Sequence, residues 1–143
     1  VPDDGVVVWG KGFDVDSVGR LRWLSGPDVV YWGDLDTHGF AILDRLRAWL
    51  PAARSVLMDR ETLLAHRDRW VTEVRPAKSV LPRLTPDERN LYTELVEGGL
   101  GDRVRLEQER IDWGWAALRL RAAFTTAATP PETPDSDSRP AAP

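Results

Sequence analysis

The sequence predicts an α/β fold, in which a parallel sheet is flanked by helices and additional helices follow at the carboxyl end. Three short apolar runs, at residues 6–9, 29–32 and 55–58, have the length and residue types of buried strands. The stretches between them are long enough for one helix and two loops each, as in βαβ units. Since such crossovers are right-handed, we expect the three runs to lie in one parallel sheet.

Apolar residues at helical spacing mark both connecting segments. The first predicted helix covers residues 15–24 and ends at a Ser-Gly-Pro sequence, and the second covers residues 40–50 and ends at a proline. Beyond the third run, the pattern predicts a helix within residues 61–70 and then a loop over residues 76–82. The order of elements is therefore strand and helix in alternation, followed by helices.

The next helix has the clearest boundaries in the chain. Thr85 is placed to cap it, Pro86 occupies its first position, and Glu88 completes a capping box. Gly98-Gly99 predicts its end, because glycine readily adopts the left-handed conformation that terminates a helix. A final helix is expected over residues 112–124, with an aspartate as its cap.

Length and composition allow one domain of ordinary size. We expect residues 1–124 to form it, and residues 125–143, rich in Pro, Thr, Ala and Asp, to be a disordered tail. The absence of cysteine excludes disulfides and thiolate metal sites, and the formal charge of −4 argues against binding DNA through bulk positive charge. No signal peptide or membrane span is apparent, so a cytoplasmic location without membrane contact is expected.

An acidic pair follows the second apolar run. Asp34 and Asp36 stand at positions i and i+2, which share one face of an extended chain. In parallel α/β sheets, ligands bind at the carboxyl ends of the strands, and hard cations prefer oxygen ligands. The sequence therefore predicts a Mg²⁺ site at Asp34 and Asp36.

Four segments, taken in order, resemble the carboxyl-terminal region of the JetD family, the nuclease subunits of Wadjet anti-plasmid systems. The segments are residues 9–13, 31–43, 55–59 and 105–111. Gly33 to Gly39, after a predicted strand, is also similar to the Asp-x-Asp motif of Toprim domains, the Mg²⁺-binding modules of topoisomerases, primases and some nucleases. The resemblance covers residues 5–124 and implies a Toprim-like domain similar to that of the topoisomerase VI A subunit.

This resemblance implies a DNA-cleaving subunit that acts with a condensin-like SMC complex, with Asp34 and Asp36 as catalytic metal ligands. Toprim domains also use a glutamate at the end of an earlier strand, whereas no glutamate precedes Glu61 here. Because the chain opens at Val1 without an initiator methionine, we expect a fragment that lacks its first strand and does not cleave DNA alone. A natural inactive variant and a homodimer are left open.

Three further residues are candidates for phosphate contact. His38 either contacts phosphate or bound water or is simply solvated, and we favour the second. Lys11 stands between two glycines after the first apolar run, where it either touches phosphate or only makes a turn. Gly39 leaves room for the backbone to approach phosphate near a helix start, whose free N–H groups attract anions.

Three more carboxylates are secondary candidates for the same site. Asp59 follows the third apolar run, where it either adds a carboxylate to the sheet edge or caps the next helix, the interpretation that we favour. Glu107 and Glu109 approach the metal only if their segment is extended, because in a helix they would point apart.

Two other classes of function remain as alternatives. The first is a non-catalytic Toprim-like module that only docks to partner subunits. The second is a phosphatase of the haloacid-dehalogenase type, whose motif also begins with Asp-x-Asp. That motif expects Thr or Val where this chain has His38, and its downstream lysine would have to be Lys78, in a proline-flanked loop.

Overall fold

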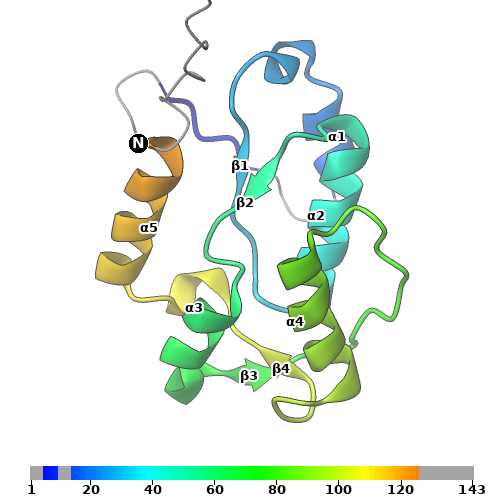
Figure 1. Cartoon of the computed structure of the whole chain (residues 1–143), viewed down its shortest axis with the longest axis vertical. Helices are drawn as coiled ribbons and strands as arrows, with labels where there is room; N and C mark the ends of the chain where they lie inside the picture. Colours follow the sequence, from blue (N-terminus) through cyan, green and yellow to red (C-terminus); the bar gives the residue numbers. More distant parts are fainter. Residues whose placement is uncertain (1–4, 10–13, 126–143) are drawn as a thin grey trace, which may run out of the picture.

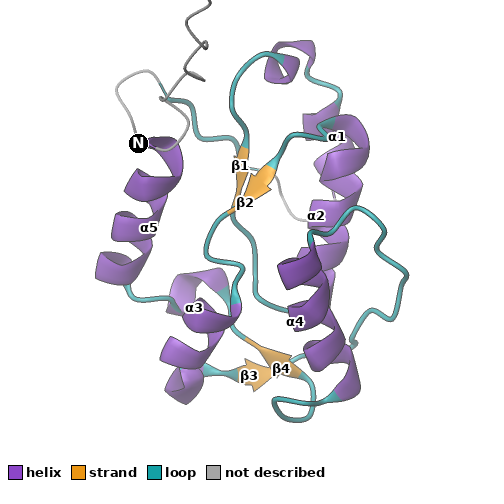
Figure 2. Ribbon diagram, viewed as in Figure 1, coloured by secondary structure: helices purple, strands orange, loops and turns teal. Residues whose placement is uncertain are grey.

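Helices and short strands alternate in the computed structural model, which describes residues 5–9 and 14–125 (Figures 1 and 2). The elements are α1 (Val15–Gly19), the 3₁₀ helix η2 (Arg22–Ser25), β1 (Val30–Tyr31), α2 (Thr37–Trp49), β2 (Arg54–Ser55), α3 (Arg60–Ala65), η3 (Arg67–Arg69), β3 (Val71–Thr72), α4 (Pro86–Glu97), β4 (Val104–Arg105), η4 (Gln108–Arg110) and α5 (Trp113–Thr125). The fold is α/β, as predicted, and its likeness to Toprim domains stays a prediction.

A parallel pair of strands lies at the centre of the molecule (Figure 2). β1 pairs with β2, Val30 opposite Arg54 and Tyr31 opposite Ser55, and α2 forms the crossover between them. The strand predicted over 29–32 is thus present but shorter, whereas the strand predicted over 55–58 overlaps β2 only at Ser55. β2 ends early because Leu57 adopts a positive φ of 62°, which no β-strand accommodates.

The strand predicted over residues 6–9 is wrong. The structure describes residues 5–9 as irregular chain, and Val6, Val7 and Trp9 are 74%, 76% and 85% exposed. A short apolar run is compatible with a strand, but it forms one only where a neighbouring strand offers an edge for hydrogen bonding. Among the described residues, the parallel sheet therefore has two strands rather than three.

Two helices agree closely with the sequence. α2 buries Phe40, Leu43 and Leu46 on the face that the spacing predicted. α4 has the predicted capping box, in which Thr85 and Glu88 bond reciprocally, and it ends at Gly98 with a positive φ of 73°. In each, the sequence pattern and the local end signals favour the same structure.

The predicted helices over 15–24 and 61–70 are each split into an α-helix and a 3₁₀ turn. The chain becomes extended at Leu21, between α1 and η2, and leaves the helical region at His66, between α3 and η3. Both segments are too short for backbone hydrogen bonding alone to hold a continuous helix, so packing decides their shape. The loop predicted over 76–82 is confirmed.

A second sheet was not predicted. β3 and β4 pair antiparallel, and an isolated bridge between Leu35 and Leu106 extends this pairing toward the predicted metal site. The Glu73 N–H also donates to the Arg103 carbonyl over 2.7 Å. Residues 71–73 and 103–106 thereby lie against the chain that follows β1.

The apolar core has two parts that share α2. The larger part includes Leu35, Phe40 and Leu43, together with residues of α3, α4 and α5, and the smaller lies between α1 and the end of α2. In the view of Figure 1, α2 and α4 lie on one side of the parallel strands and α5 on the other. No helix within the described ranges is both long and apolar enough to cross a membrane.

Candidate functional site

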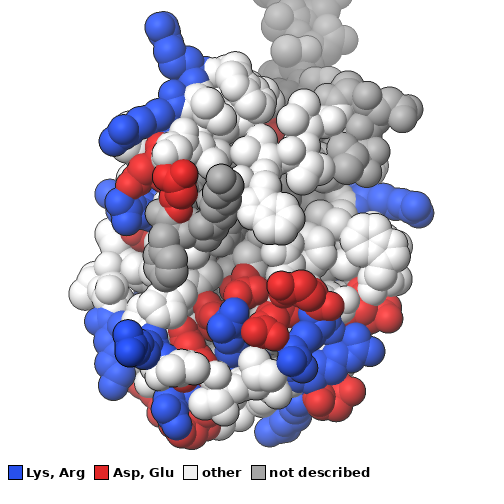
Figure 3. Space-filling view, turned by 180° about the vertical axis from the view of Figure 1, so that it is seen from behind, with Lys and Arg blue, Asp and Glu red and all other residues white. Residues whose placement is uncertain are grey.

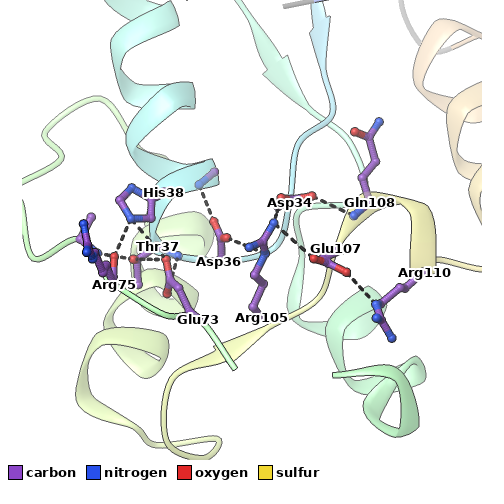
Figure 4. Close-up of polar contacts among 12 residues, drawn as sticks. Asp34, Asp36, Thr37, His38, Glu73, Arg75, Arg105, Glu107, Gln108 and Arg110 are labelled. Atoms are coloured by element: carbon purple, nitrogen blue, oxygen red, sulfur yellow. Dashed lines mark hydrogen bonds and ion pairs between the residues drawn. The ribbon is translucent and has the colours of Figure 1, made fainter. Parts of the chain in front are cut away.

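The acidic pair lies on an extended segment, four residues after the start of β1. Leu35, between Asp34 and Asp36, exchanges backbone hydrogen bonds of 2.9 and 3.1 Å with Leu106. This bridge places the two carboxylates on one side of the segment, as their spacing predicted, and both face Arg105 of β4 (Figure 4).

Each of these carboxylates has one oxygen bound by a backbone N–H and the other directed at Arg105. Asp34 Oδ1 accepts from the Gln108 N–H over 2.9 Å, and Asp36 Oδ1 accepts from the Gly39 N–H over 2.7 Å. The second oxygens lie 2.7 Å from Arg105 Nη2 and 3.2 Å from Arg105 Nε, respectively. The guanidinium therefore lies between the two aspartates.

Arg105 is the cation of the site. It also lies 3.5 Å from a Glu107 oxygen, so it faces three carboxylates in all (Figure 4). Burial would lower the pKa of Arg105, but the hydrogen bond with Asp34 and the neighbouring negative charges raise it, so the group stays charged. Its buried Nε is close to Asp36, yet the geometry gives it no hydrogen bond. This attraction is therefore ionic and not directional.

Asp36 is the most perturbed acid of the site. Burial is the largest cause and raises its pKa, the hydrogen bond from Gly39 opposes the rise, and the charges of Glu73 and Asp34 add to it. Arg105 offsets only part of this effect, and the pKa of Asp36 is about 6. Burial and the neighbouring negative charges therefore disfavour the ionised form of Asp36 more than Arg105 and Gly39 favour it.

Glu73, just after β3, is a buried carboxylate that the sequence analysis missed. It is 2% exposed, and it accepts hydrogen bonds from the Thr37 hydroxyl over 2.7 Å and the Thr37 N–H over 3.4 Å. The same hydroxyl accepts from the Ala77 N–H over 2.6 Å. Thr37, directly after Asp36, thus fixes the loop that follows β3 to the first turn of α2.

His38 fixes the same loop. Its Nε2 lies 2.6 Å from the Arg75 carbonyl oxygen and 3.9 Å from a Glu73 oxygen, and its side chain is 37% exposed. A phosphate contact for His38 stays a prediction. Two of the first N–H groups of α2 already donate to carboxylates: the Thr37 N–H to Glu73 and the Gly39 N–H to Asp36. An incoming anion would compete with these internal hydrogen bonds.

Gly39 has a structural reason to be glycine. A Cβ atom at this position would overlap the carbonyl oxygen of Asp34 and lie 3.3 Å from the methyl carbon of Met58. The lack of a side chain therefore lets α2 begin directly against the acidic segment. Phosphate binding near Gly39 stays a prediction, and Lys11 lies outside the described residues.

The remaining predicted carboxylates divide into near and distant ones. Glu107 lies in an extended conformation beside Arg105, and its other oxygen pairs with Arg110 over 2.7 Å. Glu109 is exposed within η4. Asp59 caps α3 by accepting from the Thr62 N–H over 2.7 Å, and among the described residues it forms no hydrogen bond or ion pair with the acidic pair.

The donor set suits a hard divalent cation only if Arg105 gives way. No group of three or more acidic or histidine side chains within the described ranges stands ready to hold a metal ion. However, oxygens of Asp34, Asp36 and Glu107 surround one guanidinium, and such oxygens are the ligands that Mg²⁺ prefers. The ligand chemistry fits Mg²⁺, and the present spacing is that of an arginine complex.

The charged side chains around this site are mixed in sign. Figure 3 shows acidic groups bordered by Lys and Arg side chains over the lower part of the molecule, the level at which β3 and β4 lie in Figure 1. An arrangement of this kind favours a polyanion only locally, since the whole chain carries a formal charge of −4.

A known family matches most of the chain. The family model described as "Wadjet protein JetD, C-terminal" matches residues 1–120 of the chain. No curated protein matches the sequence. The match includes Asp34, Asp36, Glu73, Arg105 and Glu107, so the whole cluster lies within the family region.

Proposed function

The chain belongs to the family of the carboxyl-terminal region of Wadjet protein JetD, and on this premise we propose that it is the metal-binding part of a DNA-cleaving subunit. Asp34 and Asp36 are the proposed ligands of a divalent cation, with Mg²⁺ as the natural ion. Glu107 is a third, weaker candidate. The fold around these residues would then be a Toprim-like domain.

The observation that supports this proposal most is the direction of two oxygen atoms. Asp34 Oδ2 and Asp36 Oδ2 come from different ends of one short segment, and both are directed at the same cationic group. Backbone N–H groups hold the other oxygen of each carboxylate, so neither side chain is free to turn away. Two fixed oxygens around one cation are an arrangement that suits a divalent ion.

The residues around the pair have distinct parts in this proposal. A bound divalent ion would neutralise charge on a phosphodiester and activate a water molecule. The chain itself orients the ligands: Gln108 holds Asp34 through its N–H, and Gly39 does the same for Asp36. Glu73 and Thr37 keep the start of α2 in place, and Asp36 caps that helix.

Partners are proposed from the family alone. A Wadjet component acts in a multi-subunit system, so we propose DNA as substrate and an SMC-like complex as the assembly that presents it. Because the resemblance to Toprim domains implies a glutamate at the end of an earlier strand and no glutamate precedes Glu61 in this sequence, we propose that this chain alone does not cleave DNA.

Calorimetric titration with Mn²⁺ and Mg²⁺ tests the metal site. We expect Asp34→Asn and Asp36→Asn each to weaken Mn²⁺ binding by at least about 100-fold, since loss of supporting residues alone reduces affinity by up to that factor. Asp28→Asn is the matched control. Asp28 is an exposed carboxylate that pairs with Arg54, and its substitution removes the same charge as each site variant does. Equal Mn²⁺ affinity in all four proteins would exclude this site.

Cleavage is tested in the full-length protein that contains this chain. Asp34→Asn and Asp36→Asn should each abolish DNA cleavage while the protein stays folded, whereas Asp28→Asn should cleave at the wild-type rate. A variant that unfolds would show that its aspartate is structural. Cleavage by either site variant near the wild-type rate would contradict the metal-nuclease assignment.

The docking module is the second candidate function, and one observation favours it. Arg105 already lies between the two aspartates and offsets part of their charge, and within the described ranges no ready group of three ligands exists. If no divalent cation binds to the wild-type chain or to the full-length protein, the docking function becomes the better explanation. The phosphatase gains no support, because Lys78 is exposed and forms no ion pair with the acidic pair among the described contacts.

A further inference from the structure

We propose that Arg105 is an internal counter-ion that occupies the cation position between Asp34 and Asp36 and competes with a divalent ion for it. This inference rests on the proposed metal site and concerns its regulation. Arg105 was not among the residues that the sequence singled out. It reaches the site because β4 pairs with β3 and because Leu106 bridges to Leu35.

The geometry makes the two occupants mutually exclusive. Arg105 Nη2 and Nε lie 2.7 and 3.2 Å from the same two oxygens that the backbone leaves available, Asp34 Oδ2 and Asp36 Oδ2. A divalent ion that binds both oxygens must lie between them, where the guanidinium now lies (Figure 4). Like charges in one position repel strongly, so binding of the ion requires the guanidinium to move away.

Arg105 is able to leave without unfolding the strand. Its backbone is fixed by pairing with Val71, whereas its side chain is 31% exposed, with only Nε buried against Asp36. Glu107, 32% exposed and 3.5 Å from Nη2, offers a second acceptor outside the aspartate pair, in which case the two aspartates hold the ion without Glu107. Only a side-chain rotation is therefore needed, not a change in fold.

The consequence is a lower apparent affinity for the divalent ion. A site that is available for only a fraction of the time binds more weakly by that fraction. Without a metal, Arg105 also limits the repulsion between the two aspartates, so the metal-free site stays folded. Competition by Arg105 would thus raise the concentration of divalent ion that is needed to fill the site.

Titration of Arg105→Gln with Mn²⁺ tests the competition. We expect this variant to bind Mn²⁺ about tenfold more tightly than wild type, a change within the range of about 5- to 150-fold that is typical of coupled binding events. Arg103→Gln is the matched control. Arg103 is exposed and pairs with Asp102, and its substitution removes the same charge two residues away from Arg105. The Mn²⁺ affinity of Arg103→Gln should stay within about twofold of wild type, since Arg103 is exposed, is already paired with Asp102, and contacts none of the site carboxylates among the described ion pairs.

Arg105→Lys provides a second variant with the charge retained. Its ammonium group is a compact point charge that cannot span both aspartates, so its Mn²⁺ affinity should lie between those of wild type and Arg105→Gln. Thermal melting with increasing Mn²⁺ gives an independent measure, also usable for a variant that folds only with metal. The rise in Tm should be largest for Arg105→Gln.

The outcomes separate this inference from the proposed function. If wild type binds Mn²⁺, Asp34→Asn does not, and both Arg105 variants bind no more tightly than wild type, Arg105 does not compete and only this inference is overturned. If neither wild type nor Arg105→Gln binds Mn²⁺, the metal site and the inference both fall. If Arg103→Gln increases Mn²⁺ affinity as much as Arg105→Gln does, the change in net charge explains the effect, and the inference is also overturned.

Discussion

Gly39 shows how one residue sets the distance between a helix and the acidic segment. Its missing side chain lets α2 begin against the carbonyl oxygen of Asp34. Gly39→Ala should therefore destabilise the fold by about 2–4 kcal/mol, because a backbone atom cannot move aside as a flexible side chain would. Urea unfolding followed by circular dichroism measures this change.

The control is a glycine whose Cβ position meets only ordinary contacts. A Cβ atom at Gly99 would lie 3.7 Å from its nearest non-adjacent neighbour, the Glu94 carbonyl oxygen, and the backbone of Gly99 is outside the left-handed region. Gly99→Ala should leave stability unchanged or raise it by up to about 1 kcal/mol, since alanine restricts the unfolded chain. Equal effects of the two substitutions would mean that close packing at Gly39 is not what requires a glycine.

Sequence reasoning found the acidic pair but not the residues that complete its surroundings. Asp34 and Asp36 stand out because their spacing and the strand before them are local features. Arg105 lies 71 residues from its partner Asp34 in the sequence, and Glu73 lies 36 residues from its partner Thr37. The short β3–β4 pairing that positions both has no periodic signal in the sequence. A buried glutamate such as Glu73 could not be recognised without its partners.

At the scale of elements, a buried ion pair joins α2, β2 and α4. Arg47 of α2 bonds both oxygens of Glu88 over 2.5 and 2.9 Å, and Ser55 of β2 adds a third bond of 2.6 Å. Burial alone would raise the pKa of Glu88, but the hydrogen bonds from Arg47 and Ser55 lower it below its ordinary value of 4.5. The pair therefore favours the ionised acid.

This shift predicts how stability changes with pH. Since the pKa of Glu88 is lower in the folded state, its contribution is complete above pH 4.5 and is lost as the pH falls through the folded value. Arg47→Met removes the main partner, so the pKa of Glu88 rises and this acid-induced loss becomes smaller. At pH 7 the variant should be less stable by about 3 kcal/mol, and the difference should shrink between pH 5 and pH 3.

Urea unfolding of both proteins at several pH values checks this prediction. The other carboxylates titrate in both proteins, so the difference between the two free energies of unfolding isolates the pair. Parallel pH profiles would show that Arg47 does not set the pKa of Glu88.

Elements with strong end signals were predicted well, and elements that depend on distant partners were not. α4 has its capping box and terminal glycine written in consecutive residues. By contrast, residues 6–9 resemble residues 29–32 in composition, yet only the second run has a strand beside it among the described residues. Pairing between strands is decided by tertiary structure, which a single short run cannot encode.

At the scale of the whole molecule, α2 divides the apolar core into two parts of unequal size. Leu43 lies fully buried in the larger part, with α3, α4 and α5 around it. Leu46, one turn further, lies in the smaller part with Val15 and Leu24 of the α1–η2 segment. Because the smaller part has few members, we expect it to open locally while the rest stays folded.

Hydrogen exchange of two leucine variants tests this division. Leu43→Ala should destabilise the whole molecule by about 3–5 kcal/mol, because a fully enclosed side chain leaves a cavity that cannot collapse. Leu46→Ala should cost about 2 kcal/mol or less and should speed exchange mainly in residues 15–25, since α1 and η2 can move toward the vacated space. Amides of α4, which contact only the larger part, should then exchange as in wild type. If Leu46→Ala instead accelerates exchange equally in α4 and α1, the two parts unfold as one cooperative unit, and the acidic segment at the start of α2 is no more stable than the α1–η2 segment at its end.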